Sequence, residues 1–241
     1  MSSFTSHTAQ RLINAVIFGW QSAKANVIPG LIIVSIAALI VFAYYQFPAV
    51  GTSLEGLVKF RQQLGVWFSI AASAVGAGII PGIYLIISGR SRKGFRGIID
   101  LLFTCVVWSV TAFVLDRFYN FQAWLWGSAV NSQVLVGKML IDQFIFTPLV
   151  GVQIPAIGFR LRDLNYDFYA FWDAFLGDWL IGVTTPLLIA CWMTWIPGTL
   201  VIYSLPLTLQ IPMMVLIQCF FALEVAYASS KMKFIPQSKM S

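Results

Sequence analysis

The sequence has few charged residues and almost no histidine. Charged side chains make up 10% of the 241 residues, against about a quarter in soluble domains. Together with a hydrophobic content of 59%, this deficit leaves too little polar surface for a soluble domain and predicts a membrane protein. His7 is the single histidine and lies in a polar N-terminal stretch, so histidine acid–base chemistry and a histidine metal site are poorly supported.

Cysteine pairs and catalytic motifs are also missing. The three cysteines stand far apart inside apolar runs, without CxxC or metal-ligand spacing, and we expect reduced packing residues at Cys105, Cys191 and Cys219. The chain contains no GxSxG, HExxH or P-loop, and no carboxylate pair with a supporting histidine. We therefore expect no enzyme, no cofactor and no bound metal.

The net charge of +6 does not indicate a nucleic-acid partner. The basic residues flank the apolar segments and form no extended basic face. Lysine and arginine at the ends of apolar spans are typical of loops that remain in the cytoplasm. Membrane lipids are therefore the expected partners, and no nucleic acid is expected.

Long apolar runs are what the sequence does contain. Six of them are long enough to cross a hydrocarbon core of about 30 Å as helices, at about 28–47, 64–88, 98–118, 134–159, 184–205 and 207–227. The predicted fold class is all-α, a polytopic membrane bundle of about six transmembrane helices with additional interfacial helices. The expected parts are an interfacial segment 1–27, for which a mitochondrial transit peptide is the weaker alternative, the bundle 28–230 and a basic tail 231–241.

The distribution of positive charge predicts the orientation of this bundle. With six spans both termini lie on one side, and 11 of the 15 lysines and arginines fall on that side. The positive-inside rule then places both termini in the cytoplasm. We expect the plasma membrane of a bacterium, with the mitochondrial inner membrane as the alternative.

Two local patterns flank the second span. Ala74, Gly78 and Gly82 recur every four residues, and small residues so spaced allow close helix approach, within the chain or in a homo-oligomer. The loop that follows gathers positive charge at Arg90, Arg92, Lys93 and Arg96. It is interpreted as a cytoplasmic anchor, with binding of anionic lipid or another ligand as the functional alternative.

The most informative stretch is KMLIDQFIFTPL, residues 138–149, because it places polar groups inside an apolar run. Lys138 and Asp142 are four residues apart and can pair on one helix face. Gln143 points about 100° away and can bond to a second helix. Pro148 frees the carbonyl of Phe144. This cluster either lines a wet cavity or clamps helices together, and the sequence leaves both interpretations open; Gln210 and Gln218 could face the same interior.

These residues also carry a resemblance to a known family. KMLIDQFIFTP at 138–148 is similar to the K-M-x-x-D-Q-x-x-x-x-P signature of the Mpv-seventeen/peroxisomal-membrane-protein family. LDRF at 115–118, with Asp116 and Arg117, precedes the signature as in mitochondrial members. Downstream, Trp192, Trp195 and Pro197 resemble the family's W-x-x-W-P element. The YSLP that ends at Pro206 resembles the family's F/Y-x-x-V-P element. The match covers roughly residues 90–230.

The chain departs from the family at several points. GAGIIPGIYL at 76–85 lacks the glycine–aspartate and glutamine pattern of the family's first span, and Gln210 stands where an arginine is usual. WIPG replaces the usual W-P, and residues 1–63 have no clear counterpart in the short eukaryotic members. The chain therefore looks like a bacterial relative with an added N-terminal span.

The resemblance implies a small membrane protein that forms a weakly selective channel for ions or small metabolites. The pore residues that carry over are Lys138, Asp142, Gln143 and Pro148, with Gln218 as a further candidate from the sequence itself. Asp116, Arg117, Trp195, Pro197 and Pro206 would be structural companions. The competing hypotheses are a non-transporting scaffold or assembly protein and, more remotely, a lipid-handling protein.

Overall fold

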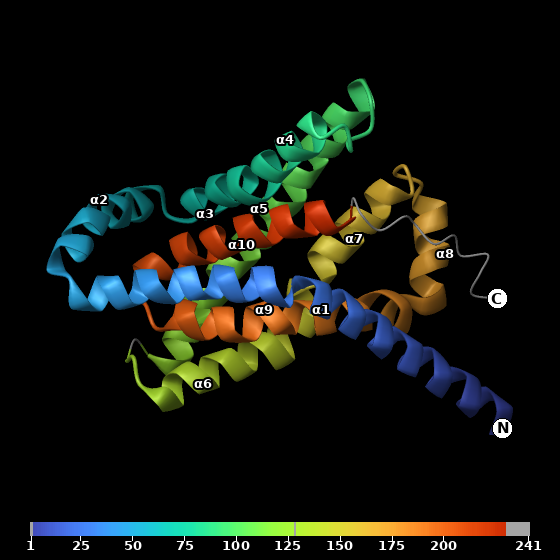
Figure 1. Ribbon diagram of the computed structural model, residues 1–241, viewed down its shortest axis with the longest axis horizontal. Coiled ribbons are helices and arrows are strands. Elements are labelled where there is room, and N and C mark those ends of the chain that lie inside the picture. Colours follow the sequence, from blue (N-terminus) through green and yellow to red (C-terminus); the bar gives the residue numbers. More distant parts are fainter. Residues whose placement is uncertain (1, 128, 230–241) are drawn as a thin grey trace.

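The computed structural model describes residues 2–127 and 129–229, and every regular element in this part of the chain is a helix (Figure 1). This confirms the all-α class. Three spans contain a π-helical segment, labelled η. In chain order the elements are α1 Ser2–Gln46, α2 Pro48–Leu64, α3 Val66–Ser73, η1 Ala74–Ile79, α4 Ile80–Ile87, α5 Phe95–Trp126, α6 Ser132–Ile141, η2 Asp142–Gly151, α7 Gln153–Asp163, α8 Phe168–Asp178, η3 Trp179–Thr184, α9 Thr185–Tyr203 and α10 Leu207–Ser229. The predicted basic tail 231–241 lies outside the described residues.

Four helical stretches are long and apolar enough to cross a membrane: Val66–Ile87, Phe95–Trp126, Ser132–Asp163 and Trp179–Tyr203. A fifth crossing is possible if Gly30–Gln46 and Pro48–Leu64, which meet at an angle of 107°, form one broken span. The last apolar stretch, Leu207–Leu223, is shorter. The outer face is apolar, since Leu39, Leu102 and Leu149 are 60–70% exposed, and it fits a lipid environment. The number of spans found is thus four or five, and six stays a prediction.

The expected interfacial segment and first span form one continuous helix. α1 runs from Ser2 to Gln46 through Pro29 and Gly30, where the sequence suggested that a span begins. Its 45 residues make a rod of roughly 68 Å, more than twice the thickness of a hydrocarbon core. The N-terminal end of α1 accordingly extends beyond the other helices (Figure 1).

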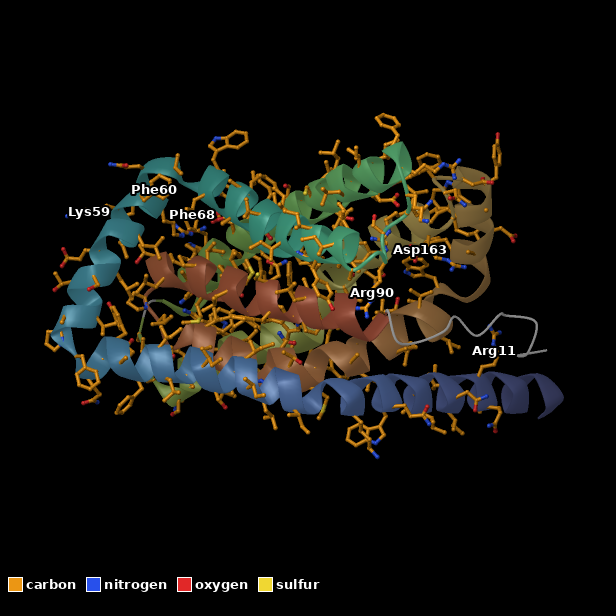
Figure 2. The ribbon with its side chains drawn as sticks, turned by 45° about the horizontal axis from the view of Figure 1, so that its top comes forward. Arg11, Lys59, Phe60, Phe68, Arg90 and Asp163 are labelled. Atoms are coloured by element: carbon orange, nitrogen blue, oxygen red, sulfur yellow. The ribbon has the colours of Figure 1, made fainter. Side chains whose placement is uncertain are left out.

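The chain changes direction at Pro48, between α1 and α2. This proline occupies the first turn of α2, where its missing N–H is not needed, and the two helices diverge sharply there. The segment between the first two predicted spans is the helix α2. Figure 2 shows Lys59 of α2 at one end of the bundle and Arg90 and Asp163 toward the other.

α10 occupies the centre of the bundle. It contacts α1, α9, α5 and the three consecutive elements α3, η1 and α4 (Figure 1). The side chains of Ile211, Met214 and Ile217 on α10 have no exposed surface. Around this core α1 packs along α9, and α5 packs against α3, η1 and α7.

The small residues of the second span do bring two helices close together, but within one chain. A Cβ atom on Gly78 would lie 3.0 Å from the Cα atom of Cys105 in α5. One on Gly82 would overlap Leu101 of the same helix. These two glycines therefore pack against α5 of the same chain. They give no support to the prediction of a homo-oligomer.

Candidate functional site

The segment singled out from the sequence is buried and changes its helical register. α6 ends at Ile141, and η2 begins at Asp142 and contains Pro148. The side chains of Lys138 and Asp142 are each 3% exposed, and that of Gln143 is 1% exposed. A short π segment often marks a functional position in a helix, so this is the candidate site.

Asp142 is held mainly by a residue that sequence analysis did not assign to the site. The Tyr203 hydroxyl, from the end of α9, donates to Asp142 Oδ2 at 2.6 Å. Gln143 Nε2 and the Thr147 hydroxyl donate to Oδ1 at 3.0 and 3.3 Å. The carboxylate thus receives three hydrogen bonds, one of them from another helix.

The expected ion pair between Lys138 and Asp142 is not formed. Lys138 Nζ instead donates to the carbonyl of Gly127 at 2.9 Å and lies 5.9 Å from the centre of the Tyr203 ring. Gly127 follows the last residue of α5, where helix carbonyls lack intrahelical partners. The long lysine side chain reaches that acceptor, and Tyr203 takes its place at Asp142.

The carbonyl freed by Pro148 is also not the one expected. In η2 the hydrogen bonds span five residues, as in Val152 N–H to the Thr147 carbonyl at 2.9 Å. Pro148 therefore leaves unpaired the carbonyl of Gln143 and not that of Phe144. Trp192 Nε1, from α9, donates to this Gln143 carbonyl at 2.9 Å. The prediction of a freed carbonyl was right in kind and wrong by one residue.

Two amide groups in the cluster have an acceptor without a partner. Gln122 of α5 donates through Nε2 to the Lys138 carbonyl at 2.9 Å, and Gln143 donates to Asp142. The Oε1 atoms of both side chains are buried and accept no hydrogen bond. Gln122 was missed by sequence analysis because the predicted span ended at residue 118, whereas α5 continues to Trp126 and buries this glutamine completely.

The other predicted residues form separate polar links. Asp116 is 1% exposed and binds Arg61 at 3.0 Å, the Ser69 hydroxyl at 2.7 Å and Arg117 at 2.6 Å. Gln218 accepts from the Ser73 hydroxyl at 2.9 Å, so its partner is on α3 and is not Asp142. Gln210 donates to the carbonyl of Leu205. The predicted polar residues thus divide among at least three places in the bundle.

Besides Asp116 and Arg117 on α5, the structural companions suggested by the family resemblance lie on α9 and just before α10. Trp195 packs edge-on against Phe221, with 5.9 Å between ring centres. Pro197 lies inside the continuous helix α9, so it does not end that span. Pro206 directly precedes α10, and its carbonyl accepts from Leu209 N–H.

Among the described residues no group of three or more histidine, cysteine, aspartate or glutamate side chains could hold a metal ion. The cysteines at 105, 191 and 219 are free thiols. The chemistry available at the site is therefore that of one carboxylate, one ammonium group, phenol and amide dipoles. Such a set can bind or pass a small polar species.

The fold and site together define an α-helical protein whose apolar helices fit an integral membrane protein and whose interior holds a polar cluster around Asp142. Comparison of the chain with protein-family models, curated proteins and solved structures gives no match in any of the three. The similarity to the Mpv-seventeen family thus stays a prediction based on the motif residues.

Proposed function

We propose that the protein is a membrane channel or pore of low selectivity for ions or small metabolites, and that the Asp142 cluster lies on its path. The observation that carries this proposal is the pair of buried amide oxygens, Gln122 Oε1 and Gln143 Oε1, that lack hydrogen-bond partners. Gln143 bonds the Asp142 carboxylate, and Gln122 bonds the carbonyl of Lys138. A buried acceptor without a partner costs free energy. Water or a permeating cation would satisfy both oxygens.

In the described conformation the cluster is packed, so conduction requires an opening. The contact to break is the hydrogen bond from Tyr203 to Asp142, because it joins α9 to η2. The irregular backbone of η2 around Pro148 gives that segment a second way to satisfy its hydrogen bonds. Opening would expose the Asp142 carboxylate and favour cations.

The proposal includes six spans, with both termini in the cytoplasm of a bacterium and with the mitochondrial inner membrane as the alternative. Gly30–Gln46 and α10 would be the first and last spans. The charge distribution supports this arrangement. Lys59 lies between the first two spans and Arg90 between the second and third, so six spans place them on opposite sides, and they lie toward opposite ends of the bundle (Figure 2). We also propose membership of the Mpv-seventeen family, supported by the order of its motif residues.

A second candidate function is a scaffold that conducts nothing. It is favoured by the polar links between helices: Tyr203 to Asp142, Arg61 to Asp116 and Ser73 to Gln218. Hydrogen bonds between membrane helices contribute about 0.6 kcal/mol each on average. Under this proposal the cluster determines helix packing, and the protein assists the assembly of other membrane proteins.

The experiment is planar-bilayer conductance of the purified protein beside an Asp142→Asn variant. A channel gives discrete currents, and loss of the Asp142 charge lowers the preference for cations over anions. Asp173→Asn is the matched control, because the same change is made at an exposed carboxylate of α8 and should leave the currents unaltered.

If the folded protein gave no current, the channel proposal would be wrong and the scaffold proposal would be favoured. Currents that Asp142→Asn and Asp173→Asn leave equally untouched would retain a channel but remove Asp142 from its path.

A further inference from the structure

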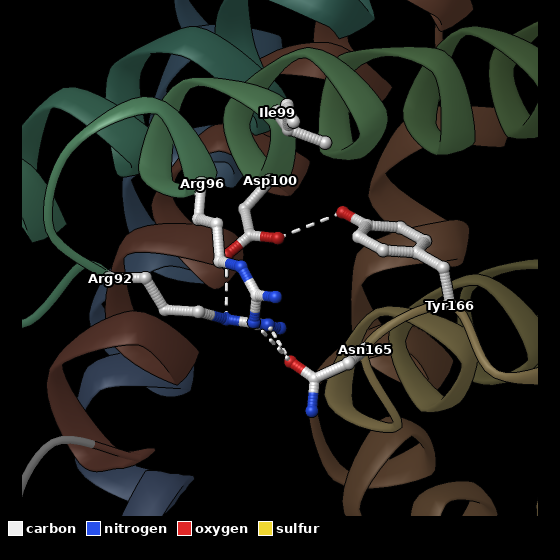
Figure 3. Close-up of a pocket in the computed structure, with 6 residues that line it drawn as sticks. All are labelled: Arg92, Arg96, Ile99, Asp100, Asn165 and Tyr166. Atoms are coloured by element: carbon white, nitrogen blue, oxygen red, sulfur yellow. Dashed lines mark hydrogen bonds and ion pairs between the residues drawn. The ribbon is translucent and has the colours of Figure 1, made fainter.

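A cavity separate from the Asp142 cluster lies where the α4–α5 connection meets the turn between α7 and α8. Its volume is about 210 Å³. Figure 3 shows its lining, Arg92, Arg96, Ile99, Asp100, Asn165 and Tyr166. The cavity is thus at the ends of two apolar helical stretches, Phe95–Trp126 and Ser132–Asp163. The ends of membrane-spanning helices are where a protein meets lipid headgroups.

The inner wall of the cavity is fixed by the side chain of Arg92. Its Nε atom lies 2.8 Å from Asp100 Oδ2, and its other nitrogens donate to Asn165 Oδ1 and to the carbonyl of Arg162. The Tyr166 hydroxyl donates to the second oxygen of Asp100 at 2.8 Å. Both oxygens of Asp100 are therefore engaged, and Arg92 balances its charge.

The turn that supplies Asn165 and Tyr166 has an unusual backbone. Their φ angles are +57° and +64°, and a bulky residue in this left-handed region is strained. The Tyr166 ring packs edge-on against Phe103, 5.1 Å between ring centres, which holds the conformation. Burial, with the hydrogen bond to Asp100, raises the pKa of Tyr166 to about 12, so its hydroxyl stays protonated and adds no negative charge.

Arg96 supplies the positive charge that the wall does not neutralise. Its side chain is exposed, and it donates a long hydrogen bond, 3.4 Å from Nη1 to Asn165 Oδ1. Among the described residues no carboxylate forms an ion pair with Arg96, whereas Arg92 pairs with Asp100 and Arg162 pairs with Asp163. A guanidinium with open donors matches the oxygens of a phosphate group.

An apolar stripe on α5 begins at the same cavity. Ile99 lines the cavity, and exposed side chains continue along the helix at spacings of three and four residues, namely Phe95, Ile99, Leu102 and Val106, which are 76%, 37%, 60% and 57% exposed. Residues so spaced share one helix face. A molecule with a phosphate in the cavity could lay apolar chains on this stripe.

We propose that the cavity binds the phosphate group of a membrane phospholipid, with Arg96 at the phosphate oxygens and the acyl chains along the α5 stripe. A soluble phosphate compound shares the headgroup chemistry but would leave the apolar stripe unused. The combination of open positive charge and apolar stripe therefore favours the lipid. The site is independent of any channel activity at Asp142.

The test is thermal unfolding of the protein in a non-ionic detergent with increasing phosphatidylglycerol. The lipid should raise the Tm of the wild type. Arg96→Gln should raise the lipid concentration for half the effect about tenfold, the result of losing one charge-assisted hydrogen bond. Lys93→Gln is the matched control, because it removes the same charge from the same loop at an exposed residue outside the cavity, and should change that concentration less than twofold.

Equal weakening in Arg96→Gln and Lys93→Gln would overturn the proposal, because it would mean diffuse attraction to a basic loop. If inorganic phosphate raised the Tm at the same concentrations as the lipid, in an Arg96-dependent way, the site would take soluble phosphate and the lipid assignment would be wrong. A third variant, Arg96→Lys, guards against misfolding: it keeps the charge and should bind with intermediate strength, and full loss there with an unchanged lipid-free Tm would also count against the proposal.

Discussion

At the scale of single residues, the interior depends on buried carboxylates that are bonded to side chains of other helices. Asp142 and Asp116 are both nearly fully buried, but their partners differ in kind. Asp142 accepts a hydrogen bond from the Tyr203 hydroxyl, whereas Asp116 forms an ion pair with the guanidinium of Arg61. Removal of these partners should therefore have different costs.

Removing the Tyr203 hydroxyl by Tyr203→Phe should lower the free energy of unfolding by about 1–3 kcal/mol, because a buried carboxylate loses a hydrogen bond. The measurement is thermal unfolding in detergent. Tyr45→Phe is the control: its hydroxyl donates to the Ser204 carbonyl at 2.6 Å, but at an exposed position, and its loss should cost less. If Tyr203→Phe and Tyr45→Phe lowered the free energy of unfolding equally, burial of Asp142 would add nothing to the strength of its hydrogen bond.

Breaking the Arg61–Asp116 pair should cost more. Asp116→Leu leaves the Arg61 guanidinium buried without its carboxylate, with an expected loss of about 3–5 kcal/mol. The double variant Arg61→Leu/Asp116→Leu should recover most of that loss, since no buried charge is left unpaired and the Arg117 side chain, which also contacts Asp116, is 57% exposed. A double-mutant cycle from chemical unfolding gives the coupling, and additive losses would contradict the pairing.

At the scale of elements, the sequence predicts the apolar helices well and their rotations poorly. The apolar runs predict where Val66–Ile87 and Trp179–Tyr203 lie, because burial in lipid needs only length and composition. The partners of Asp142 were not predictable, since a π segment rotates everything after it relative to a regular helix. That rotation is why the freed carbonyl is that of Gln143. Lys138 precedes the π segment and does not pair with Asp142 because its side chain reaches the carbonyl of Gly127. Tyr203 and Gln122 come from other helices, whose facing sides a single sequence does not reveal.

The η2 geometry makes Trp192 and Pro148 interdependent. Trp192→Phe removes the donor to the Gln143 carbonyl and should cost about 1–3 kcal/mol. In a Pro148→Ala background the new N–H at position 148 can donate to that carbonyl, so the same Trp192→Phe change should cost much less. Thermal unfolding of the four proteins measures this, and an unchanged cost would refute the assigned register.

Glycine substitutions test the close contact between the second span and α5. Gly78→Ala places a Cβ 3.0 Å from the Cys105 Cα atom and should destabilise by about 1–3 kcal/mol. Gly56→Ala in α2 meets nothing within 4 Å and should stabilise by about 0.5–1 kcal/mol. The two Tm shifts should have opposite signs, and a shared sign would contradict the packing.

At the scale of the whole molecule, the number of crossings determines which side each end occupies. Six spans put both ends of the chain on one side, whereas five, with Gly30–Gln46 and Pro48–Leu64 as one broken span, put them on opposite sides. Reporter groups fused to each end and tested with a membrane-impermeant reagent should report the same side. Opposite sides would refute the six-span proposal.

The central position of α10 has a consequence for biosynthesis. Ribosomes deliver the chain from its N-terminus at about 5–20 residues per second, and α10 is the last of the described helices to emerge. The helices that surround it, α1, α9 and the second span among them, are therefore made before the element that fills the space between them. Until translation passes α10 they lack the side chains of Met214 and Ile217, so the bundle acquires its final packing only after its other helices have been made.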